Sequence, residues 1–202
     1  MNRKWREAAL PLILIAVGAL GGWAAVNFTA QTLPPRTVEW LDNSRVIESF
    51  TLSTADGAFT EQHLRGQWHL LLFGYTHCPD ICPTSLSEID ALVRKMPVDK
   101  RISVVFVSVD AQRDSPAQLA RYLRFFNADF VGATGTPQAL TPLTDSLGIR
   151  FVISGSQEQP EIAHSLTISL VDPSGRLTGR LRPGFNIEAT AAEIARVVQD
   201  KV

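Results

Sequence analysis

Residues 68–86 read WHLLLFGYTHCPDICPTSL, and this stretch decides the fold. It opens with a continuous apolar run, residues 68–75, which is typical of a strand buried on both faces of a sheet. The run leads into a loop that holds both of the chain's cysteines, Cys78 and Cys82. A helical pattern follows the loop, so the stretch predicts a buried strand, a cysteine loop and a helix in that order.

The helix after the cysteines leads to a second buried strand. Its apolar residues recur at spacings of three and four, at Leu86, Ile89, Leu92, Val93 and Met96. Such spacing places them on one face of a helix. Residues 102–109 (ISVVFVSV) are rich in β-branched residues, which favour strands. A strand, a crossover helix and a strand form a βαβ unit, so we expect the two strands to be parallel.

Weaker patterns on either side complete an α/β domain. We expect strands over residues 46–52, 165–171 and 176–181, with a hairpin turn at 172–175, and helices over 116–126, 136–147 and 187–202. A central mixed sheet flanked by helices, with a cysteine pair at the carboxyl end of its first central strand, has the outline of a thioredoxin-like fold. The expected domain covers residues 46–202.

An uncharged segment, residues 8–26 (AALPLILIAVGALGGWAAV), precedes this domain. At helical rise it spans roughly 28 Å, which is enough to cross the hydrocarbon core of a bilayer as a transmembrane helix. Residues 1–7 carry Arg3, Lys4 and Arg6, so the positive-inside rule leaves them in the cytoplasm. The domain would then lie on the periplasmic side of a bacterial inner membrane.

The segment between anchor and domain, residues 27–45, contains Pro34 and Pro35 and is expected to be a stiff linker. A cleaved signal peptide is the alternative to an anchor, because Gly22 and Ala24 are small residues at a suitable cleavage position. Both interpretations export the domain. The formal net charge of −1 shows no basic excess, which argues against a nucleic-acid partner.

Export changes how Cys78 and Cys82 are interpreted. In the periplasm a close dithiol is driven toward a disulfide unless it is reduced or bound to metal. We expect Pro83 to be the first residue of the following helix, whose N-terminal partial charge favours thiolates. One helical turn separates the two cysteines by about 6 Å, so both a disulfide and a metal site are open. A purely structural disulfide would contribute little, because its loop is short.

Two thiolates alone make a poor enclosed metal site, so a third ligand is expected among the four histidines. His77 is adjacent to Cys78, and His164 precedes the expected strand 165–171. Loops at the carboxyl ends of parallel strands gather at one edge of a sheet, so spacing alone leaves the choice between these two open. Two Cys and one His suit Cu(I) and tolerably Cu(II), whereas structural zinc usually takes four ligands.

Three motifs carry a resemblance to a known family. Residues 73–83 (FGYTHCPDICP), residues 108–116 (SVDAQRDSP), and His164 followed by residues 168–175 (ISLVDPSG) occur in this order. They resemble the signatures of the Sco/SenC family, membrane-anchored copper proteins that assist cytochrome c oxidase assembly. The likeness covers roughly residues 49–186.

The resemblance implies that copper, as Cu(I), Cu(II) or both, is bound by Cys78, Cys82 and His164. It also implies that the two cysteines can oxidise to a disulfide. Many relatives carry Asp immediately before the distal histidine, whereas this chain has Ala163. A neighbouring carboxylate can orient an imidazole, so its absence changes the surroundings of the site but removes no ligand.

Other residues of the motifs are candidates for surrounding the metal ligands. The resemblance places Asp110, Arg113 and Asp114 at the end of the second central strand, where they would shape the metal loop or a docking surface. His77, beside the first cysteine, is a fourth candidate. Capping of a turn would explain the same acidic and basic residues equally well.

The leading functional hypothesis is a copper metallochaperone. It would receive copper from a donor protein and pass it to the copper-centre subunit of cytochrome c oxidase. The alternative is an enzyme, a thiol-disulfide reductase that acts on the oxidase's own cysteines, although C-x-x-x-C spacing and the absence of Pro after His164 weaken it. A peroxidase of the peroxiredoxin type needs an arginine beside its reactive cysteine, and no Arg lies near Cys78 in sequence.

Overall fold

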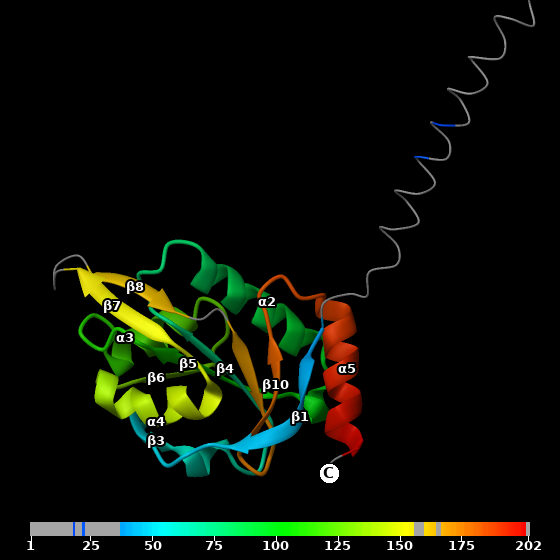
Figure 1. Ribbon diagram of the computed structural model, residues 1–202, viewed down its shortest axis with the longest axis horizontal. Helices are drawn as coiled ribbons and strands as arrows, with labels where there is room; N and C mark the ends of the chain where they lie inside the picture. Colours follow the sequence, from blue (N-terminus) through cyan, green and yellow to red (C-terminus); the bar gives the residue numbers. More distant parts are fainter. Residues whose placement is uncertain (1–17, 19–21, 23–36, 156–159, 165–166, 201–202) are drawn as a thin grey trace, which may run out of the picture. The chain divides into compact units, whose positions relative to one another are not determined.

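The computed structural model describes residues 18, 22, 37–155, 160–164 and 167–200 (Figure 1). The chain divides into two units, residues 1–35 and 36–202. The expected membrane segment lies outside the described residues except at Gly18 and Gly22. Within the part of the chain that is described, no helix is long and apolar enough to span a bilayer. The anchor therefore stays a prediction.

A mixed sheet of eight strands forms the centre of the second unit, in the order β1-β10-β9-β4-β5-β6-β2-β3. Its strands are β1 (Glu39–Val46), β2 (Thr51–Thr54), β3 (Gly57–Thr60), β4 (His69–Gly74), β5 (Ser103–Ser108), β6 (Val131–Thr134), β9 (Ile168–Val171) and β10 (Arg176–Leu181). β4, β5 and β6 are parallel, and the other neighbours are antiparallel. A separate two-stranded sheet pairs β7 (Phe151–Gly155) with β8 (Pro160–His164).

Helices cover both faces of the central sheet (Figure 1). They are α2 (Ile81–Lys95), α3 (Pro116–Leu123), α4 (Pro137–Leu147) and α5 (Ile187–Asp200), with short 3-10 turns η1 (Glu61–Leu64) and η2 (Val98–Lys100). Leu70 and Leu72 of β4 pack in one core with α2, α3 and α5, while Leu71 and Phe73 pack in the other with α4. Alternate residues of one strand thus enter opposite cores, which explains the continuous apolar run.

The central βαβ unit is confirmed. β4 and β5 pair in parallel, with Leu71 opposite Val105 and Phe73 opposite Val107. The predicted N-caps of the next two helices are also confirmed, because Ser115 and Thr136 each accept a backbone hydrogen bond and each precedes a proline. α3 ends earlier than predicted, at Leu123 rather than residue 126.

The amino-terminal boundary of the domain was predicted wrongly. Residues 39–45, expected to be linker, form most of β1, and the strand expected over 46–52 is absent because β1 ends at Val46 and β2 begins at Thr51. β1 is an edge strand that pairs with β10, and its residues are exposed or only half-buried. β1 has no apolar face, so its own residues show no alternating pattern that would predict a strand. Its pairing partner β10 lies far along the chain, so local sequence cannot reveal the pairing either.

His69 opens β4 and is almost fully buried, with 2% of its surface exposed. Its Nδ1 atom lies 3.1 Å from the backbone oxygen of Gln67, so the neutral ring can donate a hydrogen bond there. Burial lowers the pKa of His69 from 6.5 to about 4, since the charged imidazolium would lose its water. The folded protein therefore keeps this ring neutral under mildly acidic conditions.

We expect part of the protein's acid sensitivity to come from His69. The unfolded chain takes up a proton near pH 6.5 that the native state excludes, so the free energy of unfolding falls as the pH drops from about 6.5 toward 4. At pH 5 the loss relative to pH 7 is about 2 kcal/mol. Urea unfolding at both pH values should show a smaller difference for His69→Leu than for the parent. Equal differences would refute the assignment.

Candidate metal centre

The two cysteines lie where β4 leads into α2. Cys78 is in the loop after β4, and Cys82 is in the first turn of α2. Both are free thiols, and they are 8% and 2% exposed. Pro83 was predicted to be the first residue of the helix. It is the third, because α2 begins at Ile81. Its missing N–H costs nothing there, since the first turn of a helix has unpaired donors.

The side chains of Cys78 and Cys82 are close enough to interact, which raises the pKa of Cys82, while a hydrogen bond with the backbone of Tyr75 lowers it. Burial raises the pKa of the Cys82 thiol well above its usual range, and the neighbouring Cys78 adds to the effect. For Cys82, burial thus outweighs the helix N-terminus that was expected to favour thiolate. A metal ion would have to displace the proton as it binds.

Gly74 holds the sulfur of Cys82 against the backbone of β4. A Cβ atom added at this glycine would lie 2.7 Å from Cys82 Sγ and 2.9 Å from Cε2 of Phe106. These separations are well below normal van der Waals contact, so only glycine allows the sulfur to sit this close to the strand. Strand and aromatic ring together fix one of the two thiols.

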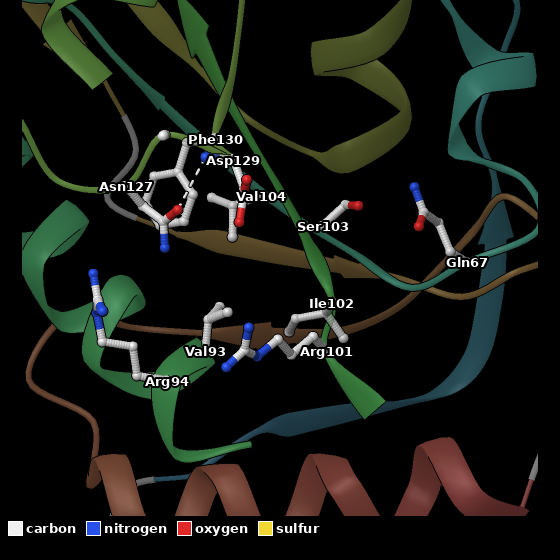
Figure 2. Close-up of a pocket in the computed structure, with 11 residues that line it drawn as sticks. Gln67, Val93, Arg94, Arg101, Ile102, Ser103, Val104, Asn127, Asp129 and Phe130 are labelled. Atoms are coloured by element: carbon white, nitrogen blue, oxygen red, sulfur yellow. Dashed lines mark hydrogen bonds between the residues drawn. The ribbon is translucent and has the colours of Figure 1, made fainter. Parts of the chain in front are cut away.

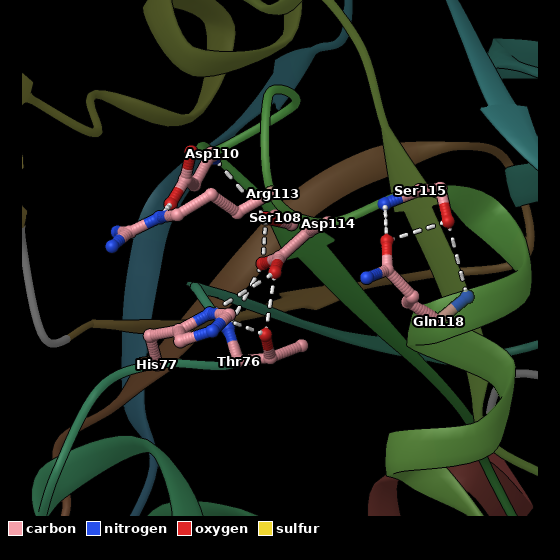
Figure 3. A network of polar contacts seen from close by, with 8 residues as sticks. All are labelled: Thr76, His77, Ser108, Asp110, Arg113, Asp114, Ser115 and Gln118. Carbon is pink, nitrogen blue, oxygen red and sulfur yellow. Dashed lines mark hydrogen bonds and ion pairs between the residues drawn. The ribbon is translucent and has the colours of Figure 1, made fainter. Parts of the chain in front are cut away.

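Asp114 joins the cysteine loop to the end of β5 (Figure 3). Its buried carboxylate accepts hydrogen bonds from the backbone N–H of Thr76 at 2.9 Å, from the Thr76 hydroxyl at 2.5 Å and from the Ser108 hydroxyl at 2.6 Å. A buried carboxylate is stable only when such donors compensate for lost hydration. Asp114 therefore ties the start of the cysteine loop to the end of β5 through backbone and hydroxyl contacts.

Asp110 and Arg113 form a second contact in the same loop, where Nε of Arg113 donates to Oδ2 of Asp110. The guanidinium carbon of Arg113 lies 6.0 Å from the ring centre of Tyr75, between β4 and the cysteines. An arginine is thus present beside the cysteine loop in space, although none is near Cys78 in sequence. The lack of an arginine near Cys78 in sequence therefore does not exclude one from the surroundings of the loop.

Of the two candidate histidines, only His77 has a described side chain. His77 is exposed, and its Nδ1 lies 3.1 Å from Thr76 Oγ1 and 3.8 Å from Asp114 Oδ1. His164 is the last residue of β8, where its backbone pairs with Phe151, and its side chain lies outside the described residues. Among the side chains that the structure describes, which exclude those of residues 153–166, no three His, Cys, Asp or Glu converge as a metal site.

Two tyrosines near the thiols were missed by sequence reasoning. Burial, reinforced by both cysteines, raises the pKa of Tyr75, and burial raises that of Tyr122 to about 12. Tyr75 was counted as the end of a strand. Tyr122 lies three residues after the buried Leu119, so its position resembles that of an ordinary core residue. Its hydroxyl is buried without a hydrogen-bond partner, and no local pattern could have indicated this.

A cleft of about 510 Å³ lies at the opposite edge of the sheet, where β5 begins (Figure 2). Ile102, Val104 and Phe130 line it together with Arg94 and Arg101. The cysteines follow the carboxyl ends of the strands, so this cleft and the metal-ligand candidates occupy different edges. This cleft is therefore separate from the candidate metal centre.

Known proteins resemble this chain in sequence and in fold. A protein of Stutzerimonas stutzeri whose name refers to copper binding is 36% identical over 149 residues, which cover 72% of this chain and 73% of that protein. The copper-bound structure of ScoI from Bradyrhizobium japonicum is 32% identical with a TM-score of 0.66, covering 78% of this chain and 99% of that one. Copper-bound yeast Sco1 is 27% identical with a TM-score of 0.71, covering 78% and 91%.

The solved relatives share the central mixed sheet with flanking helices, so the predicted thioredoxin-like fold is confirmed. A sequence model described as SCO1/SenC matches residues 39–199, from the first residue of β1 almost to the end of α5. The match includes the cysteine loop, the Asp114 contacts and the strand that carries His164. This chain belongs to the SCO1/SenC family.

Proposed function

We propose that this protein is a copper metallochaperone that binds one copper ion through Cys78, Cys82 and His164. The observation that carries the proposal is the pair of free, buried thiols in contact at the end of β4. Relatives of the same family, at 27% and 32% identity, have been solved with copper bound. Copper is the cargo of such a protein, held and then released.

The chemistry of the donors fits a soft metal ion. Two thiolates favour Cu(I), and one added imidazole makes a three-coordinate set that also tolerates Cu(II). The described side chains supply two sulfurs and no third converging donor, so the third must come from elsewhere. His164, at the position of the family's distal histidine, is the proposed third ligand. In β8 the preceding Ala163 pairs with Val152, so no carboxylate stands at that position.

The setting of the proposed activity follows from residues 1–26. The uncharged segment 8–26 with its preceding basic residues supports a single-pass anchor and a periplasmic domain. The proposed recipient is the copper-centre subunit of cytochrome c oxidase, and the proposed source is a copper-donating protein outside the cytoplasm. Family membership supports the oxidase as a partner.

A thiol-disulfide reductase is the second candidate. Contact between the thiols of Cys78 and Cys82 favours it, because two sulfurs this close can form a bond when two electrons are removed. The high pKa of Cys82 counts against it, since the thiolate is the attacking form. The two roles are compatible, because the disulfide form would be unable to bind copper.

Copper titration tests the proposal directly. We expect full-length reduced protein to bind one Cu(I) per chain and Cu(I) to protect both thiols from alkylation. His164→Ala should bind more weakly, while His63→Ala should match the parent, because this exposed histidine contacts Thr60 rather than the cysteine loop. Equal affinity of His164→Ala and the parent would show that the third ligand is wrong. Rapid insulin reduction without copper would favour the reductase instead.

A further inference from the structure

The hydrogen bonds around Thr76 determine which nitrogen of His77 carries the proton. The Thr76 hydroxyl has one hydrogen, and the 2.5 Å contact to the buried carboxylate of Asp114 uses it. The hydroxyl oxygen can then only accept from Nδ1 of His77, 3.1 Å away. The neutral ring therefore carries its proton on Nδ1 and an unshared electron pair on Nε2.

This arrangement resembles the supports that orient metal-binding histidines. In such sites the far nitrogen donates to an oxygen, which fixes the tautomer and the ring orientation and leaves the other nitrogen free for metal. Here the chain of contacts runs from Asp114 through Thr76 to His77, and Figure 3 shows the three side chains together. The His77 side chain is 57% exposed and is adjacent to Cys78.

His63 shows that this tautomer is not a general property of exposed histidines in the chain. It also contacts a threonine hydroxyl, at 3.1 Å from its Nδ1 atom. However, the backbone N–H of Thr60 donates to the same Nδ1 at 3.0 Å. Neutral His63 must therefore carry its proton on Nε2, which is the reverse of His77.

His77 is not assembled with the two thiols in this conformation. No three potential donors converge among the described residues, although Cys78, Cys82 and His77 are all described. A role as permanent third ligand is therefore unsupported. Nε2 of His77 has a free electron pair and lies near the two thiols without joining them. Such a position suits a ligand that binds copper only during its release from the site.

We propose that Nε2 of His77 is the transfer ligand that copper takes as it leaves the site. This inference rests on the proposed function and adds a residue to it. His164 is carried by the separate β7–β8 sheet, whereas His77 shares a loop with Cys78. A recipient that displaces His164 from copper leaves both thiolates bound, and His77 remains beside them because it lies on the same loop as Cys78.

The exchange step is balanced without other reactants. One Cu–N bond, to His164, breaks, and one Cu–N bond, to Nε2 of His77, forms. Both imidazoles are neutral before and after, so no proton moves. Copper keeps its oxidation state and both thiolates until thiolates of the recipient replace them. The effect is to hold the ion at the exposed side of the site during its transfer.

The rate of copper release distinguishes a transfer ligand from a resting ligand, which is one that stays bound to copper in the loaded protein. Full-length Cu(I)-loaded protein is mixed with a strong Cu(I) chelator, bathocuproine disulfonate, and the rate and equilibrium of copper transfer are both measured. Loss of one metal contact in the transition state should slow release from His77→Ala about tenfold. The equilibrium affinity should be unchanged. His63→Ala is the matched control and should release copper at the parent rate.

Free imidazole provides the second measurement. Added to His77→Ala, it should restore much of the lost rate by supplying the missing nitrogen, and it should not accelerate the parent. A variant as fast as the parent, or a slow variant that imidazole does not rescue, would overturn the transfer role. Equal losses of rate and affinity would make His77 a resting ligand. A parent that binds no copper would overturn the proposed function as well, whereas the other failures leave it standing.

Discussion

Replacing Asp114 with alanine is expected to lower the free energy of unfolding by about 3–5 kcal/mol, since buried donors left without a partner cost about 1–3 kcal/mol each. The carboxylate is fully buried and accepts from the Thr76 N–H, the Thr76 hydroxyl and the Ser108 hydroxyl. Alanine would remove the acceptor of all three donors, of which the Ser108 hydroxyl is buried and the two Thr76 groups are partly buried, and would leave a small cavity. The cysteine loop would also lose its tie to β5.

Urea unfolding of Asp114→Ala, Asp114→Asn and the parent measures this effect. The amide of Asn keeps the shape and one acceptor oxygen, so its cost should be intermediate. Asp99→Ala removes an exposed carboxylate and should change stability little. We also expect weaker copper binding for Asp114→Ala, because Thr76 precedes the metal loop. A stability equal to that of Asp99→Ala would show that the hydroxyl contacts contribute nothing.

Gly74→Ala should weaken both folding and metal binding. The new Cβ would meet Cys82 Sγ at 2.7 Å and the ring of Phe106 at 2.9 Å, and Phe106 is fully buried. Overpacking of a closed core typically costs about 1–3 kcal/mol. The ring has little room to move, so we expect the sulfur to shift away from β4. Copper affinity should then fall together with stability.

Gly132→Ala is the matched control for this prediction. Its Cβ would lie 2.7 Å from Leu119 Cβ and 3.0 Å from Leu123 Cδ1, a clash of similar severity between β6 and α3. No cysteine is among its contacts, so this variant should lose stability but bind copper like the parent once folded. Chemical denaturation and Cu(I) competition on the same samples give both quantities. If the two variants bound copper equally well, Gly74 would have no specific effect on Cys82.

The central part of the fold could be predicted because its signals are local. β4 and β5 are continuous apolar runs, and the helix between them shows its period within fifteen residues. The N-caps Ser115 and Thr136 act on backbone groups three residues away. β6 gave no such signal, because its four residues, VGAT, include a glycine that is required by the packing of Leu119.

In the candidate site, too, some features could be predicted from the sequence and others could not. Sequence identified Cys78 and Cys82 as a pair, and the family motif singled out His164, Asp110, Arg113 and Asp114. It could not show that burial keeps Cys82 protonated. Nor could it show that Arg113 approaches Tyr75, since thirty-eight positions separate them and only the parallel pairing of β4 with β5 brings their loops together.

By itself, therefore, the sequence determined the two buried strands, the helix between them and the residues available to bind a soft metal. Each depends on residue type and on spacings of a few positions, which set burial and hydrogen bonding within one element. Only the tertiary structure decided which groups meet. Asp114 accepts a hydrogen bond from Thr76 of another loop, and β1 pairs with β10 from the other end of the domain. Gly74 allows β4 to lie close to the sulfur of Cys82. Such contacts depend on how strands pair and helices pack, because separation along the chain does not fix distance in the folded protein.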